Sequence, residues 1–168
     1  MGMPGIAGGP IFISTRPRLT SHRGKLLSGA AERGTPVYAA SFIRQRRIVI
    51  DTALLSDRRM FKLILAHEFF HFVWLRLGNT ARWEFEALLK DELRQHARGE
   101  LGESSCVKKA HAQAGPRCWT DYVCESFCDT GAWLYSGIAT HPTFSLAARW
   151  RNKRAQWFRS RFERYTKV

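Results

Sequence analysis

Four stretches of the chain carry apolar residues at the spacing of an amphipathic helix. The clearest begins after Ser56 and Asp57, residue types that favour helix N-termini, and ends at Gly78 and Asn79. Its apolar positions recur about every 3.6 residues, which predicts a helix of roughly five turns. The three other predicted helices cover about residues 81–98, 120–135 and 143–165.

Two short β-prone runs precede the first helix. Residues 37–43 and 48–50 are rich in apolar and aromatic side chains, and the polar residues 44–47 between them are typical of a turn. They predict an antiparallel hairpin. In contrast, the Gly-, Pro-, Ser- and Arg-rich residues 1–35 predict a loosely ordered arm, and the polar residues 99–116 predict a long mobile loop.

The length and composition favour one compact core. A chain of 168 residues with 45% hydrophobic residues can bury a single core but hardly two. We therefore expect an N-terminal arm over 1–35, an α+β domain over 36–140 and a C-terminal helix over 141–168 that packs on it. No leader pattern and no run of about 18 apolar residues is present, so we expect a cytoplasmic protein without membrane contact.

The net charge of +13 is concentrated at the C-terminal end. Residues 149–168 hold eight Lys or Arg against one Glu, a net charge of +7. Such a segment is either a solvated helix face or a surface for nucleic acid, an acidic protein or an anionic surface. Its aromatic residues are explained more simply by packing on the domain than by stacking on bases.

The first predicted helix contains the pattern H-E-x-x-H, formed by His67, Glu68 and His71. Residues four apart share a helix face, so both imidazoles can reach one metal ion while Glu68 lies at its open side. The alternative is a pair of core histidines. It is less favoured because buried histidines need polar partners and an unpaired buried Glu68 is costly.

A later predicted helix supplies a third ligand. Glu125 and Asp129 are also four residues apart. A catalytic zinc commonly takes two His and one carboxylate, and a ligating imidazole donates its other N–H to an acceptor. Glu125 is therefore the expected ligand and Asp129 the expected acceptor. If Glu125 is instead an ordinary charged residue, Glu86 or Glu92 would replace it.

All four cysteines lie in the second half of the chain, at Cys106, Cys118, Cys124 and Cys128. They lack paired C-x-x-C spacing, which makes a structural zinc site the lesser alternative, and we expect reduced thiols. Cys124 and Cys128 are predicted to be small buried residues. Thiols this close to the expected zinc could nevertheless compete for it or respond to oxidation.

H-E-x-x-H followed by E-x-x-x-D on a later helix resembles the gluzincin metallopeptidases. The hairpin and residues 51–72 are, within that group, similar to the small ImmA/IrrE-type peptidases, and the similarity covers roughly residues 36–137. The chain departs from the family pattern in two places. Phe70 stands where Gly usually precedes the second His, and the separation between His71 and Glu125 is long.

The resemblance implies a zincin-like fold and a zinc-dependent peptidase with one ion per chain. Glu68 would act as general base, and Tyr135 or His141 would help to stabilise the oxyanion. The substrate would be a narrow protein target, such as a DNA-binding transcription regulator, paired as an added strand along residues 47–50. The alternative is a basic module that binds nucleic acid or a regulator on a zincin scaffold, with a structural metal and no proteolysis.

Overall fold

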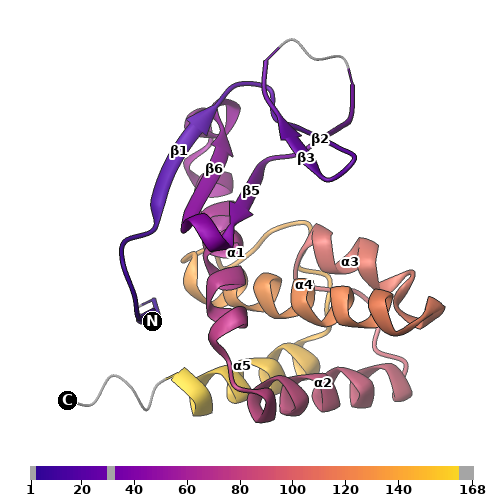
Figure 1. Cartoon of the computed structure of the whole chain (residues 1–168). Helices are drawn as coiled ribbons and strands as arrows, with labels where there is room; N and C mark the ends of the chain where they lie inside the picture. The colour runs from indigo at the N-terminus through magenta and orange to yellow at the C-terminus, as the bar shows by residue number, and fades with distance from the viewer. Residues whose placement is uncertain (1–2, 30–32, 163–168) are drawn as a thin grey trace.

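The computed structural model describes residues 3–29 and 33–162, which form an α+β fold with five α-helices and two small three-stranded sheets (Figure 1). The strands are β1 (Phe12–Arg16), β2 (Thr20–His22), β3 (Lys25–Leu27), β4 (Thr35–Pro36), β5 (Ala39–Phe42) and β6 (Arg47–Asp51). The α-helices are α1 (Arg58–Arg76), α2 (Asn79–Arg94), α3 (Glu103–Lys109), α4 (Pro116–Tyr135) and α5 (Ala148–Phe162). Three short 3₁₀ helices are η1 (Ile43–Gln45), η2 (Thr52–Ser56) and η3 (Ala112–Ala114).

The main sheet has the order β1-β6-β5. Strand β5 pairs with β6 in antiparallel register, from Ala39 opposite Ile50 to Phe42 opposite Arg47, so the predicted hairpin is confirmed. Strand β1 pairs with the other edge of β6 in parallel. Because β6 is central, its Ile48 and Ile50 are fully buried, and they form a core cluster with residues of α1.

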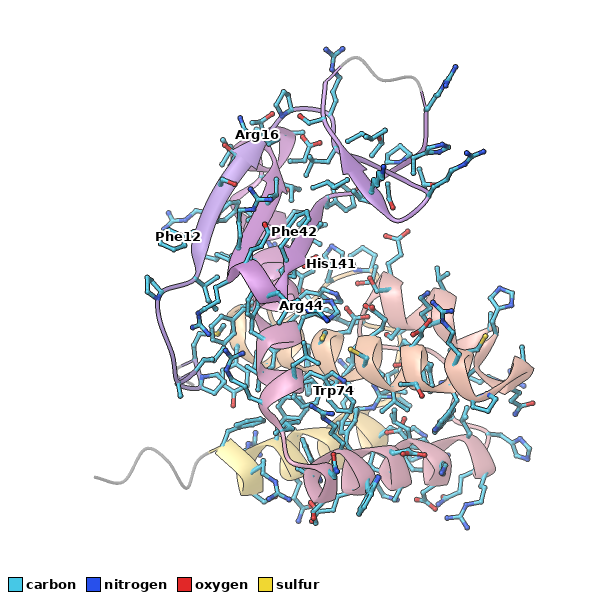
Figure 2. All side chains as sticks on the ribbon, viewed as in Figure 1. Phe12, Arg16, Phe42, Arg44, Trp74 and His141 are labelled. Atoms are coloured by element: carbon cyan, nitrogen blue, oxygen red, sulfur yellow. The ribbon has the colours of Figure 1, made fainter. Side chains whose placement is uncertain are left out.

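The expectation of a loosely ordered arm over residues 1–35 is wrong for residues 12–27. Residues 12–16 form β1 along β6, and β2 and β3 form a second sheet with β4. Four of the five β1 side chains are exposed, and Figure 2 shows Phe12 directed away from the body of the molecule. The strand is held in place by backbone pairing with β6 and not by burial of its side chains. Its sequence therefore lacks the apolar alternation that identifies a half-buried strand.

Helix α1 is confirmed where its apolar spacing predicted it. It begins after Asp57, whose side chain accepts hydrogen bonds from the amides of Arg59 and Met60, each at 3.0 Å. Such capping satisfies amides that have no partner within the helix. From the sheet, α1 runs toward α2 and α5, and α4 packs across it (Figure 1). Helices α2 and α4 are also confirmed, with shifted ends.

Phe70, the departure from the gluzincin pattern, is accommodated by a glycine on α4. The Phe70 side chain is fully buried and faces Gly131. A Cβ atom at Gly131 would lie 2.4 Å from Cγ of the Phe70 ring, closer than any real contact. The absence of a side chain at Gly131 therefore creates the space that the aromatic ring occupies between α1 and α4.

The mobile loop expected over residues 99–116 is wrong. This segment contains α3 and η3, and Glu100, Leu101 and Ser105 are buried. The polar side chain of Glu100 is bonded inside the protein and is not solvated. It accepts hydrogen bonds from the hydroxyl of Tyr122 at 2.6 Å and from the guanidinium of Arg154 at 2.9 Å.

A buried ion network joins α2, the segment before α3, and α5. Arg154 is fully buried and donates from Nε to Glu92 Oε1 at 2.9 Å and from Nη1 to Glu100 Oε2 at 2.9 Å. Nζ of Lys109 lies 3.0 Å from Oε1, the other carboxylate oxygen of Glu100. Two cations thus face two carboxylates. Arg154 and Lys109 lower the pKa of Glu100 against the opposing effect of burial.

Helix α5 begins at Ala148, five residues later than predicted. The preceding residues turn instead, because the amides of Ser145 and Leu146 both donate to the Glu100 carbonyl, at 2.9 and 3.0 Å. The last three residues predicted for this helix, 163–165, lie outside the described residues. Across the described ranges, no helix combines the length and apolarity that a membrane crossing requires.

Candidate metal centre

Two helices face each other with residues repeated four apart. Helix α1 presents His67 and His71, and α4 presents two adjacent rows. Glu125 and Asp129 form the row beside His67. The other row, Cys124 and Cys128, lies beside His71. The helical period therefore gives each imidazole its own pair of partners on α4.

His67 is fixed by acceptors at both ring nitrogens. Its Nδ1 lies 2.7 Å from Asp129 Oδ1, and its Nε2 lies 3.2 Å from Glu125 Oε2. The other Asp129 oxygen, Oδ2, accepts from the Ser105 backbone amide at 2.8 Å. A Cβ atom at Gly102 would lie within 2.1 Å of the Asp129 carboxylate. The segment around α3 thus closes over Asp129 and holds its carboxylate against the ring.

The charges of this pair perturb each other. Burial by itself lowers the pKa of His67, but the charge and hydrogen bond of Asp129 outweigh it, so the pKa lies well above its usual value. Burial raises the pKa of Asp129, yet His67 and the Ser105 amide bring it below its usual value. Burial likewise raises the pKa of Glu125, but the hydrogen bond and charge of His67 bring it below its usual value. Both carboxylates are therefore held in the anionic form that ligates or supports a metal ligand.

The donor atoms of His67, His71 and Glu125 all lie within 4.8 Å of one another. This spacing lets one ion contact all three. Because Nδ1 of His67 faces Asp129 and Nδ1 of His71 faces the thiols, Nε2 of each ring is the nitrogen left for a shared metal. Two imidazoles and a carboxylate suit zinc and other first-row divalent ions.

Glu68, which follows His67 on α1, is buried and is held by β5. Its Oε2 accepts a hydrogen bond from Ser41 Oγ at 2.6 Å, and the same hydroxyl lies 3.0 Å from the Glu68 carbonyl. Ser41 stands in the hairpin strand nearest α1. One hydroxyl therefore fixes both the backbone and the carboxylate of Glu68.

The cysteine row contacts His71 directly. Its Nδ1 is 3.3 Å from Cys128 Sγ and 3.7 Å from Cys124 Sγ. Cys128 is fully buried and Cys124 is partly buried. Two interactions lower the pKa of Cys124 to about 6. The hydrogen bond from Cys128 has the larger effect, and the interaction with His71 the smaller. All four cysteines are free thiols, as expected.

The other expected site residues lie in different surroundings. Tyr135 packs its ring on Phe70, with centroids 5.2 Å apart. His141 lies 2.7 Å from the Thr143 hydroxyl through Nδ1. A role for either in oxyanion stabilisation stays a prediction. Glu86 and Glu92, the alternative third ligands, do not lie with the donor atoms of His67 and His71. Glu86 pairs with Lys90 and Trp119, and Glu92 pairs with Arg154.

Strand β6 cannot receive an added peptide strand along residues 47–50, so this expectation is wrong. Its two edges are already paired, with β1 on one side and β5 on the other. Within the described residues, β5 has β6 as its single strand partner. The edge of β5 opposite β6 is therefore the sheet edge next to α1 that lacks a strand.

The basic residues of α5 are largely engaged by the protein itself. Arg154 is buried, Lys153 lies 3.2 Å from Asp91, and Arg161 pairs with Glu84. Arg149 covers the ring of Trp150 at 4.5 Å. Of the basic residues in this segment, two more lie in the described part, Arg151 and Arg159.

Sequence reasoning missed two groups of the site. One is Ser41, since a serine within a β-prone run carries no distinctive signal. The other is the Ser105 amide, which lies in a segment whose polarity indicated a loop. The pairing of Cys124 and Cys128 with His71 did have a signal, because their spacing repeats that of Glu125 and Asp129 one position earlier.

Comparison with known proteins gives no relative for this arrangement. No family model matches the chain, and no curated protein or solved structure matches it either.

Proposed function

We propose that this chain is a zinc-dependent peptidase of zincin-like fold, with His67, His71 and Glu125 as metal ligands and Glu68 as general base. The observation that carries the proposal is the shared geometry of α1 and α4. Three donor atoms converge within 4.8 Å, and His67 is oriented by a buried carboxylate. A merely structural pair of core histidines does not explain why a third, acidic donor is directed at the same point.

Each residue has a separate task in this mechanism. A bound zinc ion would acidify a water molecule and polarise a peptide carbonyl. Glu68 takes the proton from the attacking water and returns it to the leaving amine. Ser41 holds the Glu68 carboxylate in place through the 2.6 Å hydrogen bond. Asp129 engages Nδ1 of His67 and so leaves Nε2 as the ring nitrogen that would hold the ion.

We further propose that an extended peptide pairs with the free edge of β5. Ser41 belongs to this strand and contacts Glu68, so a peptide along the edge would pass the general base. Strand addition supplies backbone hydrogen bonds without requiring a particular sequence. Narrow specificity would then come from side-chain contacts of the substrate.

A peptide hydroxamate, which carries a metal-binding group on an extended chain, tests this placement. Its binding is expected to slow amide hydrogen exchange in residues 39–42, because these amides gain partners or lose solvent. Residues 12–16, the opposite edge of the same sheet, serve as the internal control and should exchange unchanged. Protection confined to residues 12–16 would contradict the proposed edge.

Elemental analysis of purified variants tests the metal ligands. In a background where serine replaces the two thiols beside His71, the parent chain and Glu68→Gln are expected to hold about one zinc ion, because Glu68 is not a ligand, whereas His71→Ala and Glu125→Ala should lose it. Glu86→Ala is the matched control, since this glutamate pairs with Lys90 on α2. Retention of zinc by Glu125→Ala in this thiol-free background would show that the third ligand is wrong.

The alternative function is a basic module that binds nucleic acid without proteolysis. The basic C-terminal segment suggests this function. The ion pairs that Arg154, Lys153 and Arg161 make within the protein argue against it, because they leave fewer cations for phosphate groups. A strongly salt-dependent affinity for DNA, together with no hydrolysis of any candidate protein, would support it over the peptidase.

A further inference from the structure

His71, one of the three proposed metal ligands, also belongs to a second group of donor atoms. His71, Cys124 and Cys128 have donor atoms within 4.8 Å of one another. The two thiols come from one face of α4 and approach Nδ1 of His71, the nitrogen opposite the one assigned to the first group. Two thiolates and one imidazole form a known zinc ligand set, with a fourth position left for water.

The surroundings of this group would admit an ion. His71 and Cys124 are both partly exposed, whereas Cys128 is fully buried, so the group lies at the boundary between the core and the surface. Thiolate ligands favour thiophilic ions over the harder ions that prefer carboxylate and water. The two donor groups therefore differ in the metals that they prefer.

We propose that His71, Cys124 and Cys128 form a second binding site for a thiophilic divalent cation, whose occupancy excludes a metal from the His67, His71 and Glu125 group. A neutral imidazole offers one nitrogen lone pair, so His71 serves one ion at a time. The exclusion rests on the proposed function, which assigns the first group its zinc. The thiolate site itself does not depend on that assignment.

Cadmium titration of the reduced, metal-free protein tests the site. Wild type should develop the ultraviolet absorption of thiolate-to-cadmium charge transfer at about one ion per chain. The double variant Cys124→Ser/Cys128→Ser should lose this band. Cys106→Ser/Cys118→Ser is the matched control, since it removes the other two thiols, and should keep it. Circular dichroism of each variant checks that the helices are retained.

Single histidine and glutamate variants separate this site from the proposed peptidase centre. His67→Ala and Glu125→Ala should keep the cadmium band, even though they remove the first group. His71→Ala should weaken cadmium binding at least about 10-fold, the smaller of the effects seen when a metal ligand loses its support. In wild type, cadmium should displace zinc so that the two together remain at about one ion per chain.

Three results would overturn the proposal. Absence of the charge-transfer band in reduced wild type would exclude a thiolate site. Unchanged cadmium affinity in His71→Ala, or loss of the band in His67→Ala, would show that the ligand set is different. Simultaneous binding of one zinc and one cadmium ion would show that the groups do not compete.

Discussion

Glu68→Gln is expected to lower kcat for peptide hydrolysis by about 10²–10⁴-fold, the usual contribution of a general base. The substitution keeps the size of the side chain and its capacity to bond Ser41, but an amide cannot take the proton of the attacking water. Hydrolysis can be followed by mass spectrometry of a peptide library, which detects new cleavage products whatever the preferred substrate is. Zinc content is measured on the same preparations.

The control for this experiment is Glu84→Gln. Glu84 pairs with Arg161 on an exposed part of α2 and does not belong to the metal group, so this variant should hydrolyse the library like wild type. If Glu68→Gln retained full activity together with its zinc, Glu68 would not be the base. Another group, or a contaminating protease, would then account for the cleavage.

Arg154→Met is expected to lower the free energy of unfolding by about 3–5 kcal/mol, because it leaves two buried carboxylates without their main cation. Glu92 and Glu100 are both fully buried and both bonded to Arg154. Methionine retains much of the apolar volume, so the loss would reflect charge and hydrogen bonding more than a cavity. Urea unfolding followed by circular dichroism measures it.

Arg161→Met provides the matched comparison on the same helix. Its partner Glu84 is exposed, and surface ion pairs contribute about 0–1 kcal/mol. A loss in Arg154→Met no larger than that in Arg161→Met would show that the buried network does not stabilise the fold. The comparison is informative because the two substitutions are chemically identical and differ in burial.

The sequence indicated the donor residues of the candidate site because helical spacing is local. His67 and His71 share a face for the same reason that Glu125 and Asp129 do, and apolar periodicity identified both helices independently. The packing of α1 against α4 was expected because a metal site needs ligands from both helices. The spacing of residues within each helix did not predict it. The roles of these residues remain proposals that the variants test.

The missed parts depend on contacts between distant segments. Strand β1 is held by backbone hydrogen bonds to β6, and these leave no trace in its exposed side chains. Glu100 looked like a loop residue because its partners Arg154 and Tyr122 lie far along the chain. Polar character alone cannot distinguish a solvated residue from one that is paired in the interior.

The contact between Phe70 and Gly131 also constrains the order in which these two positions can change during evolution. Glycine at position 131 tolerates a small neighbour on α1 at the cost of a cavity, whereas any larger residue at 131 collides with the aromatic ring. A lineage acquiring Phe70 would therefore have to carry Gly131 first. Substitution of Gly131 is then disfavoured for as long as the phenylalanine stays.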